Sequence, residues 1–244
     1  EQNQTLKGGY MLQVKDRLYD AKLFANYLPL DNDALRLLPA DQIFLPENFG
    51  DGTANKFAFD AIKGNTFRYL ANTILNAGFL QLDNEFTKNL RVVWGLRVEN
   101  YDQLVGSVKQ SDPRHTRTQV TDFLPGMNAT YKINQNTNLR LSGSQTVIRP
   151  ELRELSFLNL YDFELNASVN GNHQLKRTKV TNLDLRYEIY NCPGEVFSAG
   201  VFYKNFKDPI EQLFNEGIGG ASTFNFQNAE KAYSAGIELE VRKK

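Results

Sequence analysis

The sequence has one cysteine, no long apolar run and no net charge, and each shortage excludes something. With Cys192 as the single cysteine among 244 residues, no internal disulfide can form, and the redox compartment cannot be read. Lys plus Arg equals Asp plus Glu at 28 each, so the basic footprint of a nucleic-acid partner is missing. No apolar stretch approaches the ~18 residues of a membrane helix. If this chain enters a membrane, it must do so as a closed barrel of strands.

Aromatic side chains are present in quantity. They make up 12% of the residues, while the mean hydropathy is only −0.47. A soluble core usually relies on Leu, Ile and Val, whereas many Tyr and Phe residues favour strands or interfacial belts.

Alternation of apolar and polar residues with a period of two is the dominant pattern, which is typical of strands. In the clearest segment, one face reads Leu90, Val92, Trp94, Leu96 and Val98, and the other reads Arg91, Val93, Gly95, Arg97 and Glu99. The same pattern predicts strands within 5–14, 123–133, 139–144, 183–189 and 233–242. Two less regular segments, 68–82 and 196–206, bring the expected number to about eight strands.

The connections between these segments alternate in length. Short turns rich in Asn, Asp, Gly or Pro are expected at 83–89, 134–138 and 191–195. Long connections are expected at 16–67, 105–119, 147–178 and 207–230, with short helical turns within 35–38 and 55–75. This rhythm predicts an all-β fold, an antiparallel meander of about eight strands from a larger transmembrane β-barrel. Its short turns would be periplasmic and its long loops extracellular.

The polar faces of the predicted strands carry both signs of charge. Arg97 lies beside Glu99, and Asp184, Arg186 and Glu188 follow one another on one face. A water-filled lumen tolerates such ladders because opposite charges pair across strands, and these five residues are candidates for ligand contact in the lumen.

The alternative is a soluble ligand-binding β-barrel or β-sandwich with a closed apolar interior. The direction of four apolar side chains separates the two interpretations. In a membrane barrel they face outward, and in a soluble protein they converge on a core: Trp94, Leu96, Leu185 and Ile237.

The sequence predicts no enzyme, no cofactor and no metal site. His115 lies in a loop, and neither it nor His173 has Cys or carboxylate neighbours at metal-ligand spacing. Cys192 is expected in an exposed turn, as an incidental residue or as the source of an intermolecular disulfide. The mixed charges at Arg149, Glu151, Arg153 and Glu154 fit a structural ion-pair cluster better than an acid/base pair.

Aromatic residues near the long loops are the other candidates for ligand contact. Tyr161, Asp162 and Phe163 fall in one loop, together with His173. Phe214, Phe224 and Phe226 lie in or beside another. Such aromatics stack on a ligand, or they form the belt at the outer leaflet or local packing.

Four ordered motifs between residues 91 and 242 carry a family resemblance. Residues 91–99 read R-V-V-W-G-L-R-V-E, and residues 146–155 read T-V-I-R-P-E-L-R-E-L, before Tyr161-Asp162-Phe163. Residues 171–178 read G-N-H-Q-L-K-R-T, followed by N-L-D-L-R-Y-E at 182–188. Residues 202–211 read F-Y-K-N-F-K-D-P-I-E, with Asn228-Ala229 and G-I-E-L-E-V-R at 236–242 after them. Together they resemble the barrel of TonB-dependent receptors of the Bacteroidetes type, the kind with a carboxypeptidase-regulatory-like N-terminal domain. That family usually has Pro where this chain has His173.

The resemblance implies an outer-membrane receptor with a barrel of about 22 strands, an N-terminal plug and a segment that engages TonB. Such a receptor imports an extracellular nutrient and contacts outer-membrane lipid. Because the chain has room for about eight strands, we expect residues 1–244 to be a partial barrel domain without plug or remaining strands. Its outermost strands, 5–14 and 233–242, would be open edges. They could close on each other in a smaller barrel, be covered, or pair edge to edge with a second copy, which is our hypothesis for the isolated chain.

Overall fold

The computed structural model describes residues 4–50, 55–62, 68–107, 109–192, 194–216 and 222–243. The chain forms two compact units. One comprises Glu1–Leu18 together with Leu70–Lys244, and the other comprises Tyr19–Tyr69.

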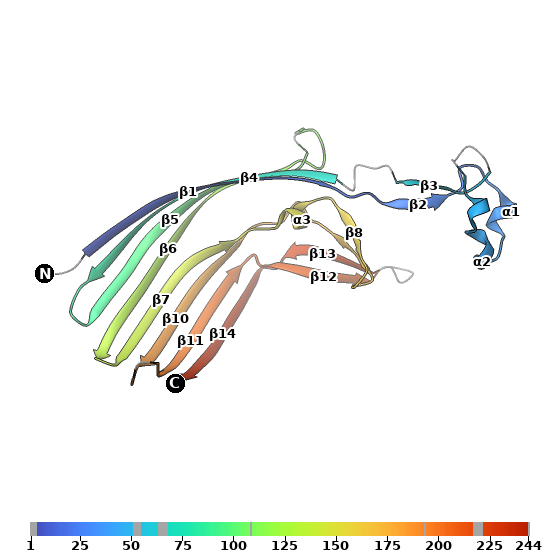
Figure 1. The fold of residues 1–244 in the computed structure, drawn as a ribbon. Helices are drawn as coiled ribbons and strands as arrows, with labels where there is room; N and C mark the ends of the chain where they lie inside the picture. Colours follow the sequence, from blue (N-terminus) through green and yellow to red (C-terminus); the bar gives the residue numbers. More distant parts are fainter. Residues whose placement is uncertain are drawn as a thin grey trace. The chain divides into compact units, whose positions relative to one another are not determined.

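The first unit is built on one eight-stranded sheet, which confirms the predicted number of strands (Figure 1). Neighbouring strands follow chain order, and every pairing from β4 to β14 is antiparallel. Over the described residues, β1 and β14 are the two edges of the sheet and are not paired with each other. The strands are β1 Gln4–Asp20, β4 Arg68–Glu85, β5 Leu90–Gly106, β6 Thr116–Asn134, β7 Thr137–Ile148, β10 Thr178–Ile189, β11 Val196–Lys207 and β14 Lys231–Arg242.

The connections alternate in length as predicted. Residues 86–89, 135–136 and 190–195 make the short turns, and the long connections join the opposite strand ends (Figure 1). The side chains of Thr87 and Asn134 shape two of these turns, because their oxygens accept the backbone N–H groups of Leu90 and Asn136. The antiparallel meander with short turns at one end and long loops at the other is therefore confirmed.

Two of the long connections carry secondary structure that the sequence did not predict. The connection between β7 and β10 contains α3 Leu152–Leu155, β8 Asn159–Asp162 and β9 Ala167–Asn170. The connection between β11 and β14 contains β12 Ile210–Glu216 and β13 Ser222–Asn228. These four strands form one sheet in the order β12-β13-β9-β8, in which β13 and β9 pair in parallel. The two loops are thus joined by backbone hydrogen bonds.

The second unit is small and holds the first long connection. Strand β2 Phe24–Tyr27 pairs with β3 Ala58–Ala61, and α1 Asp33–Arg36, α2 Ala40–Ile43 and η1 Pro46–Asn48 lie between them. The helical turn expected within 35–38 overlaps α1. The one expected within 55–75 is wrong for the described residues, which form β3 and the start of β4. Phe59 stacks on Phe24 across the strand pair, and this cross-strand contact favours the extended conformation.

The outward face of the main sheet is apolar and exposed. On β5 it runs over residues 90–98, on β6 over 123–131 and on β14 over 233–241. Nine residues match the 9–11 that a tilted strand needs to cross a bilayer. Trp94 is 47% exposed and Ile237 is 76% exposed, and Leu96 and Leu185 are exposed as well. These side chains do not converge on a core.

The opposite, inward face holds the charges. The carboxylates of Glu99, Asp122 and Glu188 are buried on it, at 6%, 3% and 6% residue exposure. A soluble barrel or sandwich would place apolar side chains inside and carboxylates in water. The observed polarity is the reverse, so the soluble alternative does not fit this fold. No helix among the described residues has the length and apolar character to cross a membrane.

The pairing between β6 and β7 stops partway along both strands. Its register runs from Asn134↔Thr137 at the turn to Gly126↔Ser144, although β6 continues to Thr116 and β7 to Ile148. Pro125 lies where the pairing ends, and proline has no N–H for a ladder, so it is confined to edge positions in sheets. Beyond this point β6 pairs with β5 and β7 pairs with β10. We call this opening the β6–β7 seam.

Candidate ligand-binding surface

A cluster of carboxylates and guanidinium groups lies on the inward face where β5 meets β6. Glu99 and Asp122 occupy directly opposite positions, where like charges repel. Arginines neutralise them. Arg97 Nε donates to Glu99 Oε1 at 2.6 Å, and Arg149 Nη2 donates to Glu99 Oε2 at 2.7 Å. Arg177 Nε donates to Asp122 Oδ1 at 2.8 Å. This group is called the β5–β6 cluster below.

Arg149 is the central member of the β5–β6 cluster. Besides Glu99, its Nη2 lies 3.5 Å from Asp122 Oδ2, so one guanidinium contacts both carboxylates. Its charge also lies over the ring of Tyr101, 4.4 Å from the centroid. Without Arg149, Glu99 would keep Arg97 and Asp122 would keep Arg177, but the two opposed carboxylates would lose the one cation that they share.

Arg149 and Arg177 also connect the two sides of the β6–β7 seam. They are the first and last residues of the connection from β7 to β10, whereas their carboxylate partners belong to β5 and β6. The loop 149–177 is therefore held at both ends to the wall across the seam. A movement of this loop would have to break or carry these ion pairs.

A second cluster lies on the inward face of β7, β10, β11 and β14. Arg140 Nε donates to Glu188 Oε2 at 2.8 Å, and Arg186 Nη2 donates to Glu240 Oε2 at 2.7 Å. Arg186 also contacts Glu188, with 3.3 Å between Nε and Oε1. Asp184 accepts a longer hydrogen bond from a serine hydroxyl of β7. The structure thus places all five predicted lumen residues on one face, but divides them between two clusters.

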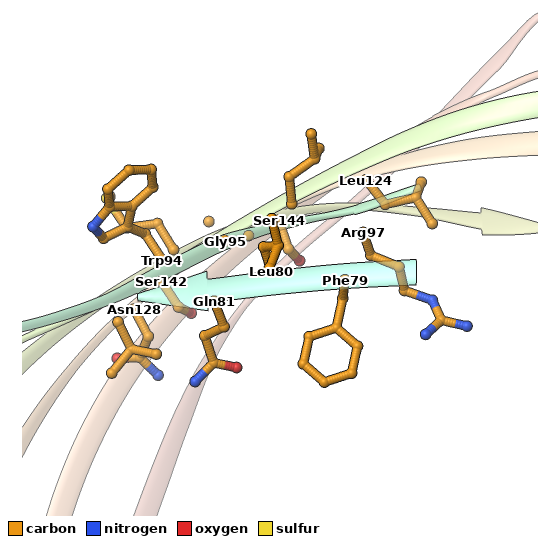
Figure 2. A pocket seen from close by; sticks show the side chains of 15 residues that line it. Phe79, Leu80, Gln81, Trp94, Gly95, Arg97, Leu124, Asn128, Ser142 and Ser144 are labelled. Carbon is orange, nitrogen blue, oxygen red and sulfur yellow. The ribbon is translucent and has the colours of Figure 1, made fainter. Parts of the chain in front are cut away.

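A hollow of 420 Å³ lies between these clusters where small residues meet (Figure 2). Gly95 and Gly126 are opposite each other across β5 and β6, and Ser144 follows on β7. A Cβ on Gly95 would overlap with the carbonyl oxygen of Leu80, so close approach of the backbones requires glycine here. Figure 2 shows Phe79 and Gln81 on one side of the sheet and Trp94 on the other.

The predicted aromatic residues lie in the loop sheet. Tyr161 is on β8, and Phe163 follows in a turn with 87% of its surface exposed. Their rings meet edge to face with centroids 5.1 Å apart, which leaves Phe163 open to solution. Asp162 has a structural part, because its carboxylate accepts the N–H groups of Glu164 and Leu165 in the same turn. Phe214 on β12 packs against Phe224 on β13.

His173 is exposed, and its ring stacks on Phe157 with 4.6 Å between the centroids. It follows Gly171 and Asn172, which have clear structural parts. A Cβ on Gly171 would overlap with the carbonyl oxygen of Ser156, so only glycine fits. The Asn172 amide donates to the carbonyl of Phe226 at 2.9 Å and joins the two loops. The motif at 171–172 therefore fixes the loops, and His173 lies on the surface that they present.

Asn228 makes the second connection between the loops. Its amide nitrogen donates to the carbonyl oxygens of Lys176 at 2.9 Å and Asp208 at 2.8 Å. Its amide oxygen accepts the Lys176 N–H at 2.8 Å. The four strands β8, β9, β12 and β13 therefore form one platform, with Tyr161 and Phe163 at its β8 edge.

Two loop carboxyls have shifted pKa values. Hydrogen bonds from Arg114, with a smaller contribution from its charge, hold the pKa of Asp112 far below its usual value. Burial raises the pKa of Glu154, whose carboxylate closes the capping box of α3 with Glu151. The expected ion-pair cluster at 149–154 is therefore wrong in its partners. Arg149 pairs with distant carboxylates, and the two glutamates cap the helix, because the turn at α3 points them at its backbone.

His115, the other histidine, lies in the connection between β5 and β6. Its Nδ1 forms a hydrogen bond with the carbonyl oxygen of Ser107, at 2.7 Å.

Sequence reasoning missed half of the inward clusters. Asp122 precedes the expected strand start by one residue, and Arg140 and Glu240 lie at polar positions of the expected strands 139–144 and 233–242, where the pattern assigns them no role. Arg177 was read only as part of a motif. The signal for Asp122 was available, since residues 116–122 continue the alternation of β6 at polar positions. Its arginine partners are 27 and 55 residues away, a separation that no local pattern reveals.

The fold and its polarity define an outer-membrane type of β-barrel wall. The family described as "TonB dependent receptor-like, beta-barrel" matches residues 9–243. The chain therefore belongs to this family of receptors, whose barrels lie in the outer membrane, and that is the location of this chain. No curated protein matches the chain in sequence.

Solved structures share the fold at low sequence identity. A variant of the ferric enterobactin receptor of Pseudomonas aeruginosa, solved with enterobactin, is 15% identical, with a TM-score of 0.56 over 98% of this chain. The ferric-catecholate import receptor Fiu of E. coli K12 is 13% identical, with a TM-score of 0.59 over 98% of this chain. A double mutant of the Serratia marcescens hemophore receptor HasR, with its hemophore and heme, is 10% identical, with a TM-score of 0.61 over 98%. This chain spans 30%, 32% and 40% of the lengths of those chains.

Proposed function

We propose that this chain forms part of the barrel of a receptor that binds an extracellular nutrient and imports it with energy coupled through TonB. One observation carries the proposal. The exposed apolar face and the buried, charge-paired inward face have the polarity of a lumen-containing membrane barrel. Family membership supports the receptor class. The proposed role is binding and transport, without catalysis.

In this proposal, the loop platform makes first contact with the nutrient. Tyr161 and Phe163 present an exposed aromatic edge, and His173 adds a ring that can donate or accept hydrogen bonds. Below the platform, the inward clusters that contain Arg97, Glu99, Asp184, Arg186 and Glu188 guide a polar ligand along the wall. TonB supplies energy through a plug domain of the receptor, which clears the path.

The finer family assignment is also a proposal. The ordered motifs support the Bacteroidetes type with a carboxypeptidase-regulatory-like domain. Two of these motifs contain residues with a structural role: Gly171 allows close approach to Ser156, and Asn228 donates a hydrogen bond to Asp208. In the receptor, β1 and β14 would pair with further strands of the barrel. For the isolated chain, edge-to-edge pairing with a second copy remains our prediction, and a monodisperse monomer in light scattering would contradict it.

The test uses cells that carry the natural gene. Deletion of the gene should abolish growth on one limiting nutrient from a panel of ferric catecholate, heme, cobalamin, glycan and peptide. The gene supplied in trans should restore growth, and loss of TonB should abolish it again. If deletion changes growth on none of them and the protein fractionates away from the outer membrane, the proposal is wrong.

A variant of the platform tests where the nutrient binds. Combined substitution of Tyr161→Ala and Phe163→Ala should reduce uptake by about tenfold. Stacking of an aromatic side chain on a ring of the nutrient contributes about 0.5–1.5 kcal/mol per ring pair to the binding free energy. Leu165→Ala is the matched control, since Leu165 is an exposed apolar residue of the same turn. Equal uptake by the variant and the control, at equal surface abundance, would remove these aromatics from the binding site.

A further inference from the structure

Three lysines stand in one row on the outward face of the sheet. Lys179 on β10 is directly opposite Lys207 on β11, and Lys207 is directly opposite Lys231 on β14. All three are exposed and share the face of Leu183 and Tyr203. Like charges that face each other across strands destabilise a sheet. This lysine row therefore needs anions to balance it.

The protein does not supply those anions among the residues that the structure describes. None of the ion pairs found there includes a member of the lysine row. The neighbouring carboxyls in the chain, Asp208 and Glu230, form no ion pair with them either. On the outward face of β5 and β6, by contrast, Asp102 and Arg117 pair at 2.7 Å. The uncompensated charge is thus local to β10, β11 and β14.

A hollow of 370 Å³ adjoins the row at the β6–β7 seam, and its lining includes residues of both faces of the sheet, among them Asp122, whose carboxylate is paired with Arg177. Lys179 and Lys207 line it together with Gln145, Thr181 and Asn205, which form the next outward position down the strands. Ammonium, hydroxyl and amide groups are the donors that phosphate oxygens accept from. Phe123, 63% exposed, forms an apolar side of the same hollow.

The height of the row on the wall indicates which anion it meets. It lies two residues, about 7 Å, above the polar position of Thr181 and Asn205, and four residues above Leu183 and Tyr203. The apolar face begins at the last pair. Charge at this height meets lipid headgroups, while the apolar face below contacts acyl chains.

We propose that the lysine row and its adjoining hollow bind the phosphate groups of a phosphorylated lipid of the outer leaflet, with the acyl chains along the apolar face below. Charge complementarity and the continuous apolar face favour a lipid over a free anion, which would gain nothing from Phe123 or Leu183. This site depends on the membrane location of the barrel and not on the transported nutrient. Its failure would leave the proposed import function intact.

The experiment uses the receptor purified from outer membranes in a non-ionic detergent, titrated with bisphosphorylated lipid A in mixed micelles. The variant K179Q/K207Q/K231Q should bind at least about tenfold more weakly, since lysines near an anionic surface attract the lipid phosphates. The control K88Q/K132Q/K204Q removes the same charge from the turns and the inward face, and should stay within about twofold of the unmodified protein. The difference should shrink as salt screens the charges.

Two further arms separate the sources of phosphate. Dephosphorylated lipid A should bind the unmodified protein and the lysine-row variant alike, and inorganic phosphate should not displace the lipid. Equal losses in the variant and the control, or displacement by inorganic phosphate at similar concentration, would overturn the proposal. Heat-modifiable migration in gels reports folding of each variant, and the single substitutions K179Q and K207Q provide the test if the triple variant does not fold.

Discussion

The main sheet has two halves that meet at the β6–β7 seam, and their strands differ in length. Strands β1, β4, β5 and β6 have 17, 18, 17 and 19 residues, whereas β7, β10, β11 and β14 have 12 each. Both halves cross the bilayer with about nine apolar-facing residues. The first half continues beyond the membrane with polar pairs such as Asp102 and Arg117. The second half ends soon after the membrane, and its loops form the platform.

The difference in strand length separates two parts of the wall: one half extends its strands beyond the membrane, and the other half carries the loop platform. The long strands extend past the apolar stretch, and on their outward face Arg117 pairs with Asp102. The short strands end near the membrane surface, and their connections form the platform. Arg149 and Arg177 hold the 149–177 loop of this platform to the long half. The two halves of the sheet are joined at the β6–β7 seam.

The largest expected effect comes from breaking that joint. Arg149→Ala should destabilise the folded protein by about 3–5 kcal/mol, because the buried Glu99 and Asp122 lose the cation that they share, and Tyr101 loses the guanidinium over its ring, although Arg97 and Arg177 remain. Arg153→Ala is the control, since Arg153 is exposed and forms no ion pair among the described residues. Urea unfolding in lipid bilayers measures both. Equal stability of the two variants would show that the β5–β6 cluster does not hold the halves together.

Arginine substitutions can show which part of the long half lies in the bilayer. Trp94→Arg should lower the free energy of unfolding by about 2–4 kcal/mol, because Trp94 is at the centre of the apolar outward stretch of β5. Asn100→Arg should lower it by about 0–1 kcal/mol. The same unfolding measurement compares them. If Asn100→Arg is as costly as Trp94→Arg, the long half enters the bilayer further than its polar residues indicate.

The platform should be sensitive to one methyl group. Gly171→Ala should destabilise the folded form of the 149–177 loop by about 1–3 kcal/mol, because the added Cβ overlaps with the carbonyl oxygen of Ser156. Gly143→Ala serves as the control, since its Cβ would meet the Leu183 side chain at 3.4 Å, an ordinary contact. Limited proteolysis should cut the 149–177 loop faster in the first variant only. Identical digestion would mean that the loop adapts.

The smallest effect concerns the loop at the rim of the long half. The folded pKa of Asp112 is lowered below its ordinary 3.8, so its bond with Arg114 stabilises the loop fully above that pH. The contribution is lost as the pH falls from 3.8 toward the lowered pKa. The hydrogen-exchange protection factors at residues 109–115, which correct for the intrinsic pH dependence of exchange, should therefore fall in acid, and Asp112→Asn should show low protection factors at every pH. An unchanged acid response in Asp112→Asn would assign the effect elsewhere.

Much of this fold could be predicted because its determinants are local. Period-two faces and turns such as 134–138 identified eight strands and the rhythm of their connections. The strand ends were less predictable, since above Val98 the outward residues Asn100 and Asp102 lose the apolar signal while β5 continues. The platform was missed because its β9–β13 pairing joins residues 55 apart in the chain. The candidate site was predicted by face but not by partner, for the same reason.

Pro125 has a consequence for the order of folding. The hairpin of β6 and β7 closes over a two-residue turn, so it can form early and zip upward from residues 134 and 137 at little cost in chain entropy. The zipper has to stop at Gly126 and Ser144, because the next residue of β6 offers no N–H to the growing ladder. The remaining strand ends are joined later by Arg177, which pairs with Asp122 of β6, and by Arg149, whose contact with Glu99 requires β5. The last contacts to form across the wall would be ionic.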